Sequence, residues 1–417
     1  MRREWTRKTL DESCYFFNGL WKGEKEPLVR VGVVRNTNFT KDGTLDDSDV
    51  AFLEVEAKKF ETRRLSYGDI ILEKSGGGPK QPVGRVALFD KKAGLFSFSN
   101  FTSAIRVKNT RELDFHFLHK LLYWTYLSGI TEGMQSNSTG IRNLDGNKYK
   151  AIKIAFPSLA EQQRIVTLLD EAFASIATAR AAATQNLQNA RAVFESHLQS
   201  VFSQRDEGWV EKPLGDLAIF RNGINFTRSS NGNSVRILGV KDFQNDFWAP
   251  LDDLEVVKPE GILPASDLLE ENDLVFVRSN GNPALIGRSV LVGNVSEKTT
   301  HSGFTIRARL HSCEVLPKYL CHFVKSANIR QEMIDGGNGA NIKSLNQGTL
   351  ARLVIPLPSL NRQIEFVRQL ELICEETQRL ESIYQRKIKA LDELKQSLLH
   401  QAFSGQLTAD VKTRKVA

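Results

Sequence analysis

The sequence predicts an α+β protein in which two duplicated, mixed α/β domains are separated by two long antiparallel helices that form a coiled coil. Three observations predict this fold. An internal repeat spans about half of the 417 residues, each half begins with strand-like segments broken by Gly, Asn, Asp and Pro, and each half ends in a long segment without Pro or Gly. A chain of this length also exceeds one ordinary domain.

The internal repeat is the strongest of these observations. Residues 157–159, Pro-Ser-Leu, recur as residues 358–360, a shift of 201 positions, and the shift grows to 203 or 204 toward the start of each half. Other matched positions are Gln162 with Gln363, Phe101 with Phe304, Gly84-Arg85 with Gly287-Arg288, and Ser75-Gly-Gly-Gly-Pro79 with Ser279-Asn-Gly-Asn-Pro283. So many matches in one order indicate a tandem duplication.

The repeat also predicts the domain boundaries. We expect a first domain over residues 1–156, a first long helix over 157–205, a second domain over 206–356, a second long helix over 357–405 and a tail over 406–417.

Within each domain, residues 68–73 and 272–277 are rich in β-branched and apolar side chains, which predicts strands that lead into Gly/Pro loops. Short amphipathic helices are expected at 114–128 and 316–327. Phe96, Phe98 and Phe101 nearly alternate, as on the buried face of a strand, and are assigned to the core.

Residues 159–203 and 360–404 carry apolar side chains at steps of three and four, which is typical of an amphipathic helix. About 45 residues at a rise of 1.5 Å make a rod of about 67 Å, whose apolar stripe needs a partner. The other long helix is the simplest partner, and the order of the halves favours an antiparallel coiled coil. The alternative is a coiled coil between copies of the chain.

Charge and composition are consistent with a cytoplasmic protein that binds a polyanion. The formal charge of +7 lies in residues 1–156, which hold 26 Lys and Arg against 19 Asp and Glu, whereas residues 209–356 hold 16 of each. No apolar run is long enough to span a membrane, and no secretory signal is apparent. The four cysteines show no metal-ligand pairing, and free thiols indicate a reducing compartment.

Three segments carry a resemblance to a known family. Phe156-Pro-Ser-Leu-Ala-Glu-Gln-Gln-Arg-Ile-Val166 is similar to the segment that opens the helices in specificity subunits of type I restriction–modification enzymes. Gln401-Ala-Phe-Ser-Gly-Gln-Leu407 resembles their helix ending, and Arg278-Ser-Asn-Gly-Asn-Pro283 resembles a loop of their target-recognition domains. The second helix departs from the pattern, with Asn361-Arg-Gln-Ile364 in place of Ala-Glu-Gln-Gln.

The resemblance implies a DNA sequence-specificity subunit that reads an asymmetric, bipartite site in double-stranded DNA, one half-site per target-recognition domain. It implies docking of two DNA-adenine methyltransferase (modification) subunits, joined by restriction/translocase subunits. S-adenosylmethionine, ATP and Mg²⁺ then belong to those partners, and this chain binds no cofactor or metal and carries no catalytic residue. In agreement, we find no Asn-Pro-Pro-Tyr segment and no Gly-x-x-x-x-Gly-Lys-Ser/Thr phosphate loop.

DNA contacts call for Lys, Arg, Ser, Asn and Gln on loops. In the first half the candidates are Arg35, Asn36, Arg63, Arg64, Lys74, Ser75, Lys80, Arg85, Asn137, Ser138 and Arg142. In the second half they are Lys241, Arg278, Ser279, Asn280, Asn282, Arg288, Asn338, Asn341 and Lys343.

Structural roles compete with DNA contact at several of these positions. The glycines after Ser75 also suit a simple hairpin turn, Arg85 and Arg288 also suit structural ion pairs, and Arg63-Arg64 also suits a solvated pair. For the whole chain, the alternatives are a coiled-coil adaptor with duplicated protein-binding domains and a self-contained enzyme.

Overall fold

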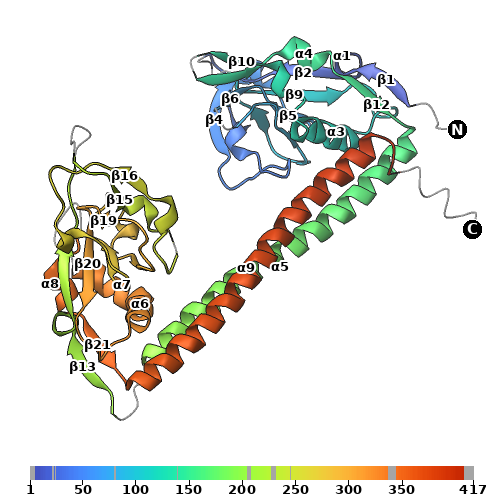
Figure 1. Ribbon diagram of the computed structural model, residues 1–417. Coiled ribbons are helices and arrows are strands. Elements are labelled where there is room, and N and C mark those ends of the chain that lie inside the picture. The colour runs from blue at the N-terminus through green and yellow to red at the C-terminus, as the bar shows by residue number, and fades with distance from the viewer. Residues whose placement is uncertain are drawn as a thin grey trace, which may run out of the picture. The chain divides into compact units, whose positions relative to one another are not determined.

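The computed structural model describes residues 5–20, 23, 25–78, 81–138, 140–203, 208–226, 232–244, 246–336 and 344–407. The chain divides into a first unit, Met1–Ala183 with Arg386–Ala417, and a second unit, Thr184–Gln385. Each unit contains one α/β domain together with part of each long helix (Figure 1).

The first unit is built around four sheets. Its strands are β1 (Thr6–Thr9), β2 (Cys14–Asn18), β3 (Leu28–Val34), β4 (Ala51–Glu56), β5 (Ile70–Glu73), β6 (Ser75–Gly77), β7 (Val86–Leu88), β8 (Phe96–Phe98), β9 (Thr102–Val107), β10 (Gln135–Ser138), β11 (Ile141–Leu144) and β12 (Lys153–Phe156). The sheet orders are β2-β9-β5-β7, β4-β3-β8, β10-β11-β6 and β1-β12.

The second unit repeats three of those sheets. Its strands are β13 (Val210–Pro213), β14 (Ala218–Asn222), β15 (Val235–Leu238), β16 (Glu255–Val257), β17 (Leu274–Val277), β18 (Ser289–Leu291), β19 (Thr299–His301), β20 (Thr305–Leu310) and β21 (Val354–Leu357). The orders β14-β20-β17-β18, β16-β15-β19 and β13-β21 match the first unit strand for strand. The duplication read from the sequence is therefore a duplication of the fold.

The fourth sheet of the first unit has a partial equivalent. Where β6 pairs with β11, the described residues of the second unit show a single bridge between Ser279 and Ser344. Residues 337–343 lie outside the described part of the chain.

The helices are α1 (Leu10–Ser13), α2 (Ala57–Glu61), α3 (Phe115–Leu127), α4 (Gly146–Lys150), α5 (Leu159–Ser203), α6 (Pro317–Lys325), α7 (Ala327–Asp335), α8 (Gln347–Ala351) and α9 (Leu360–Phe403). The side chain of Asp114 caps α3 by accepting a hydrogen bond from the backbone N–H of Phe117 at 2.9 Å. Pro317 occupies the first turn of α6, where its missing N–H costs no helical hydrogen bond.

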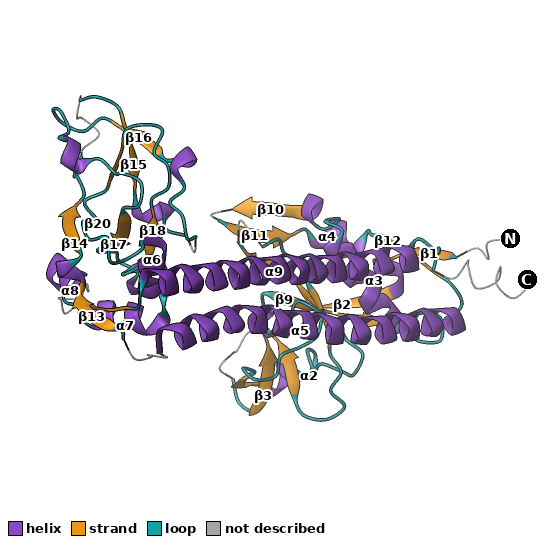
Figure 2. Ribbon diagram, turned by 60° about the horizontal axis from the view of Figure 1, so that its bottom comes forward, coloured by secondary structure: helices purple, strands orange, loops and turns teal. Residues whose placement is uncertain are grey.

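The long helices α5 and α9 lie side by side and run antiparallel within each unit (Figure 2). In the first unit, Ile165 and Leu169 share a core with Leu399 and Ala402, while Arg180 pairs with Asp392 at 3.0 Å. Moving forward along α5 thus moves backward along α9.

The second unit shows the same direction of pairing. Arg191 pairs with Glu381 at 3.1 Å, and Leu198 and Phe202 share a core with Phe366. The predicted fold class, two mixed α/β domains with two long antiparallel helices, is confirmed.

In each unit, the parts of α5 and α9 that belong to it pack into the core of its α/β domain. In the first unit, Phe117 and Leu122 of α3 pack between strands of the β2-β9-β5-β7 sheet and the ends of α5 and α9. In the second unit, Tyr319 and Phe323 of α6 take the same place, with Phe202 against both rings at 5.4 and 5.2 Å. Among the described residues, no helix is long and apolar enough to cross a membrane.

Candidate nucleic-acid interface

In the first unit, the buried strand β5 is followed by Lys74 and then by Ser75, the first residue of β6. The backbone N–H groups of both residues donate to the carbonyl oxygen of Phe101, at 3.0 and 3.2 Å. The Nζ of Lys74 donates to Oδ1 of Asn18 at 3.2 Å, and the Ser75 hydroxyl donates to Oδ1 of Asn143 at 2.6 Å. Partial burial lowers the pKa of Lys74. The loop therefore presents a cation beside amide side chains, the groups that contact phosphates and base edges.

Strands β6, β11 and β10 bring further candidates to this loop. Ser75 lies opposite Asn143, Arg142 opposite Asn137, and Ser138 opposite Ile141 in the strand registers. The structure thus brings Lys74, Ser75, Asn137, Ser138 and Arg142 together, although these residues come from segments 60 positions apart in the chain. We name this group the first-unit loop cluster.

Arg85 and Asn36 lie next to that cluster but are committed to a buried carboxylate. The Nε and Nη2 of Arg85 donate to the carboxylate of Glu73 at 2.7 and 2.8 Å, and Nδ2 of Asn36 donates to it at 3.2 Å. Glu73 is 1% exposed, and this pairing raises the pKa of Arg85. The structural ion pair that the sequence left open is therefore present at Arg85.

Three other arginines of the first unit have contacts with residues outside the loop cluster. Arg35 donates to the carboxylate and the carbonyl oxygen of Asp49, at 2.9 and 2.8 Å. The carbonyl oxygen of Arg64 accepts from Arg106 at 3.1 Å, and that of Arg63 accepts from the hydroxyl of Ser97 at 2.9 Å. Contacts with DNA at these positions remain predictions, and Lys80 lies outside the described residues.

In the second unit, β17 ends at the equivalent loop. The backbone N–H of Arg278 donates to the carbonyl oxygen of Phe304 at 2.8 Å, and its Nη1 donates to that of Gly303 at 3.4 Å. Oδ1 of Asn280 accepts from the backbone of Asn282 at 2.8 Å, and Oδ1 of Asn282 caps the short helix η7 (Pro283–Leu285). Arg278, Ser279, Asn280 and Asn282 form the second-unit loop cluster.

The other second-unit candidates have separate partners. Arg288 donates to the carbonyl oxygens of Phe243 and Gln244 at 3.0 and 3.1 Å, and Lys241 pairs with Glu255 at 2.8 Å. Asn338, Asn341 and Lys343 lie outside the described residues.

The paired Gly-Arg positions in the two halves have a backbone reason. Gly84 and Gly287 adopt φ values of 108° and 72°, a region that L side chains rarely enter. Each glycine forms the turn before the next strand. The turn places the following arginine, Arg85 or Arg288, within hydrogen-bond distance of its partners.

One sequence-based assignment is wrong. Phe98 is buried and Phe96 is half-buried, as expected of core residues, but the side chain of Phe101 is 46% exposed. Phe101 follows the end of β8, in the turn that leads into β9, so the strand alternation no longer applies there. Its counterpart Phe304 is 59% exposed.

A pair of basic residues in the second unit, Lys325 and Arg330, was not among the candidates predicted from the sequence. Lys325 donates to the carbonyl oxygen of Asp246 at 2.8 Å and Arg330 donates to that of Ala284. Burial lowers the pKa of both residues, and the charge of Arg288 lowers it further. No spacing signal marks these two residues, because they belong to different helices and meet Arg288 only in the fold.

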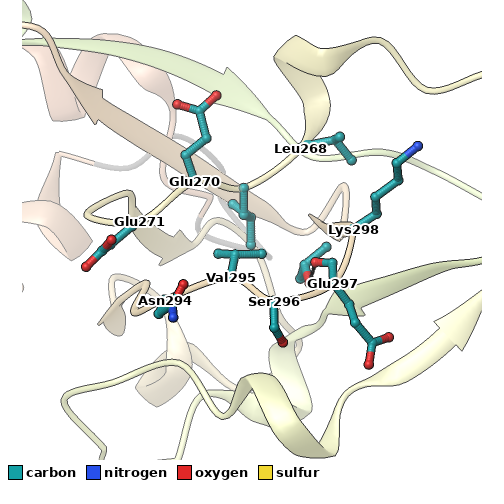
Figure 3. Close-up of a pocket in the computed structure, with 10 residues that line it drawn as sticks. Leu268, Glu270, Glu271, Asn294, Val295, Ser296, Glu297 and Lys298 are labelled. Atoms are coloured by element: carbon teal, nitrogen blue, oxygen red, sulfur yellow. Dashed lines mark hydrogen bonds between the residues drawn. The ribbon is translucent and has the colours of Figure 1, made fainter.

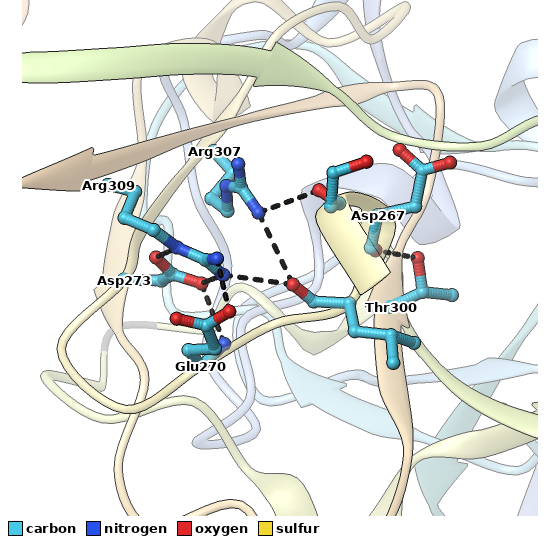
Figure 4. A network of polar contacts seen from close by, with 8 residues as sticks. Asp267, Glu270, Asp273, Thr300, Arg307 and Arg309 are labelled. Carbon is cyan, nitrogen blue, oxygen red and sulfur yellow. Dashed lines mark hydrogen bonds and ion pairs between the residues drawn. The ribbon is translucent and has the colours of Figure 1, made fainter. Parts of the chain in front are cut away.

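Buried ion pairs that recur in both units explain other charged residues. Arg106 meets Asp69 through two hydrogen bonds of 2.7 Å in the first unit. Arg309 meets Asp273 at 2.8 and 2.7 Å in the second unit, beside Arg307 (Figure 4). Asp69 and Asp273 are each 1% exposed, so Arg106 and Arg309 are paired with buried carboxylates, and both pairs are excluded from the candidate interface.

A shallow pocket of about 390 Å³ lies elsewhere in the second unit (Figure 3). Its lining includes Glu270, Glu271 and Glu297 against one cation, Lys298. Glu297 is paired with Arg236 at 2.9 Å. An excess of carboxylates repels phosphates, so this pocket is unsuited to DNA.

Comparison with known proteins agrees with this geometry. The family described as "Type I restriction modification DNA specificity domain" matches residues 4–187. The chain is 26% identical to the type I restriction enzyme StySPI specificity subunit of Salmonella potsdam, over 92% of this chain and 82% of that protein. It is also 26% identical to the EcoKI specificity subunit of Escherichia coli (strain K12), over 93% and 84%.

Solved structures share the fold. A chain from a study of complex assembly and conformational transition in the type I R-M system superposes with a TM-score of 0.76 at 16% identity, covering 97% of this chain and 99% of that chain. The HsdS subunit from Thermoanaerobacter tengcongensis gives 0.59 at 17% identity, covering 97% and 98%. The duplicated domains, the long helices and these relatives agree: over most of its length the chain is similar to the specificity subunits of type I restriction–modification enzymes.

Proposed function

We propose that this chain reads an asymmetric DNA sequence in two parts, with each α/β domain contacting one half-site. The observation that carries the proposal is the pair of loop clusters. Each cluster follows a buried strand, β5 in the first unit and β17 in the second. These two strands occupy the equivalent position in the matching four-stranded sheets of the two units. One fold presented twice with different side chains is what reading two different half-sites requires.

The side chains of the loop clusters suit both parts of DNA recognition. Lys74 and Arg278 can neutralise phosphates, while Asn and Ser side chains beside them can bond base edges. The first cluster follows Ser75 with three glycines, whereas the second follows Ser279 with Asn280, Gly281 and Asn282. The two loops therefore offer different donors and acceptors, which supports two different half-sites.

The same asymmetry appears in charge. The first α/β segment carries the whole net charge of +7, and the second is neutral. Non-specific attraction to the DNA backbone then comes mainly from the first domain. The second domain depends more on local cations, such as Arg278.

Chemistry is assigned to partner subunits. Two DNA-adenine methyltransferase subunits dock on the domains and helices and supply the S-adenosylmethionine site, and restriction/translocase subunits bind ATP and Mg²⁺. This chain selects the DNA sequence and positions those subunits. Among the described residues, no group of three or more His, Cys, Asp or Glu is arranged to hold a metal ion.

The test is selection from a random-sequence duplex library by the chain co-purified with the methyltransferase subunit encoded beside it. The proposal expects two short constant blocks separated by a stretch of fixed length and free sequence. Replacement of Lys74 or Arg278 by alanine is expected to weaken binding. Retention of library DNA without enrichment of any sequence would favour the adaptor alternative.

A further inference from the structure

Each unit exposes one phenylalanine at the same place in its fold. Phe101 and Phe304 occupy matched positions of the repeat, and 46% and 59% of their side chains are exposed. Single exposed apolar side chains are common on protein surfaces. The recurrence of an exposed ring at both copies of one position, however, points to a role that the two domains share.

The turns that carry the two rings are fixed in the same way. In the first unit, the backbone N–H and the hydroxyl of Thr102 both donate to the carbonyl oxygen of Ser99, at 3.0 and 2.8 Å. In the second unit, Thr305 makes the same two bonds to Ser302, at 2.8 and 2.7 Å. Thr102 and Thr305 are fully buried, so each turn is anchored directly after its phenylalanine and displays the ring outward.

Each of these phenylalanines is joined by a backbone hydrogen bond to a basic residue, Lys74 in the first unit and Arg278 in the second. The carbonyl oxygen of Phe101 accepts the backbone N–H of Lys74 at 3.0 Å, and that of Phe304 accepts the backbone N–H of Arg278 at 2.8 Å. Within the described residues, the side chain of Lys74 bonds only the Asn18 amide, and that of Arg278 only a carbonyl oxygen. Neither cation is neutralised by a carboxylate there.

We propose that Phe101 and Phe304 are DNA-contacting residues, each placing its ring against the bases or deoxyribose of one half-site while the adjacent Lys74 or Arg278 binds a phosphate. This inference rests on the proposed function and adds an apolar contact to it. A phenyl ring packs on the thymine methyl group or between base pairs, and cations bind the adjoining backbone.

Duplex DNA is favoured as the occupant by the charge and by the repetition. The backbone of each exposed phenylalanine is hydrogen-bonded to a lysine or arginine that no carboxylate of the described residues neutralises, and this pairing matches a surface that alternates apolar bases with phosphates. A protein that reads two half-sites needs such a pair of an exposed ring and a basic residue in each domain, and the structure has one pair in each. The ring of Phe101 also lies close to Gly76, which directly follows Ser75 of the first-unit loop cluster.

The test uses the complex with the methyltransferase subunit and its cognate duplex. We expect F101A and F304A each to lower affinity about ten-fold, the scale of a base–aromatic contact, without changing the salt dependence of binding. Loss of discrimination is expected in one half-site for F101A and in the other for F304A. F101L and F304L, which keep an apolar side chain, should recover part of the affinity.

The matched controls are F52A in the first unit and I262A in the second, because Phe52 and Ile262 are 56% and 87% exposed and lie outside the loop clusters. Thermal unfolding should be unchanged in all variants. The inference is overturned when F101A and F304A bind DNA with the affinity of the controls. It is also overturned when their only defect is that the methyltransferase subunit no longer co-purifies with them. Absence of sequence-specific binding by the unmodified complex refutes the proposed function itself, and this inference with it.

Discussion

The side-chain amide of Gln162 donates a hydrogen bond of 2.8 Å to the carbonyl oxygen of Pro157, five residues earlier. The same amide donates to the carbonyl oxygen of Glu112 and accepts from the backbone N–H of Asp114, both at 2.8 Å. Gln363 repeats the arrangement with Pro358 at 3.0 Å. Both glutamines are fully buried, and their hydrogen bonds join the start of α5 to the start of α3 and the start of α9 to the start of α6.

Replacing Gln162 by leucine is expected to lower the free energy of unfolding by about 3 kcal/mol, because three partly buried backbone groups lose their partner. Urea unfolding measures the change. The neighbouring Gln163 is exposed, so Q163L should stay within about 0.5 kcal/mol of the unmodified chain. Equal effects of the two substitutions would contradict an anchoring role for Gln162.

Arg85 and Arg288 occupy matched positions but should differ in their effect on stability. R85L leaves the Glu73 carboxylate buried beside Asn36 alone, which costs about 3–5 kcal/mol. In R288L two carbonyl oxygens lose a hydrogen-bond donor, which lowers the free energy of unfolding by about 1–3 kcal/mol. Adding E73Q to R85L should restore part of the loss in urea unfolding, since a neutral amide is less costly to bury. No recovery in the double variant would argue against a buried charge as the cause.

Lys74 and Arg278 should each account for about one phosphate contact. For K74A and R278A we expect the slope of log K against log salt to fall by about 0.9, with affinity reduced alike on cognate and unrelated duplexes. Fluorescence anisotropy at several salt concentrations measures the slope. Lys8 and Lys318 are paired with Glu112 and Glu371 at 2.6 and 2.7 Å, so K8A and K318A serve as controls with an unchanged slope.

Three buried histidines predict a loss of stability in mild acid. Burial lowers the pKa of His119 and His322 to about 4, and burial together with Arg307, Arg221 and Arg309 lowers that of His301 to about 3. The unfolded chain binds these protons near pH 6.5 and the folded chain does not. Stability is therefore full above pH 6.5 and falls as the pH drops from there toward 4.

Between pH 7.5 and 5.5 each histidine should contribute a loss of about 1.4 kcal/mol. Urea unfolding at the two values measures it, and H301Q should reduce the difference by that amount. His311 is exposed, and H311Q should leave the difference unchanged. A higher free energy of unfolding at pH 5.5 than at pH 7.5 would contradict this prediction.

Much of the fold could be predicted because the two halves repeat local signals. The step of three and four in apolar residues runs over 159–203 and 360–404, and the structure has helices at Leu159–Ser203 and Leu360–Phe403. The turn before the buried strand illustrates the limit. Gly68 and Asn272 both adopt positive φ values there, 89° and 72°. An aspartate follows each of them, but this shared residue does not reveal that the preceding position has a left-handed backbone conformation.

The candidate site was harder to predict because it depends on long-range contacts. Arg142 and Asn137 reach Lys74 only through the pairing of β11 with β6 and β10, and Lys325 meets Arg288 only through packing of α6. The exposure of Phe101 was missed because it follows two inward-facing phenylalanines, and its turn is fixed by Ser99 and Thr102. Sequence spacing identifies residue types on loops, whereas the fold decides which of them face the same way.

The most direct test of the account is a genome-wide map of adenine methylation by single-molecule sequencing, after co-expression of this chain with the methyltransferase subunit encoded beside it. The account predicts one bipartite, asymmetric methylated motif that disappears when this chain is omitted. It also predicts that R278A weakens methylation of the motif while the two proteins still co-purify. An active, S-adenosylmethionine-binding complex that leaves no motif would contradict DNA reading by this chain.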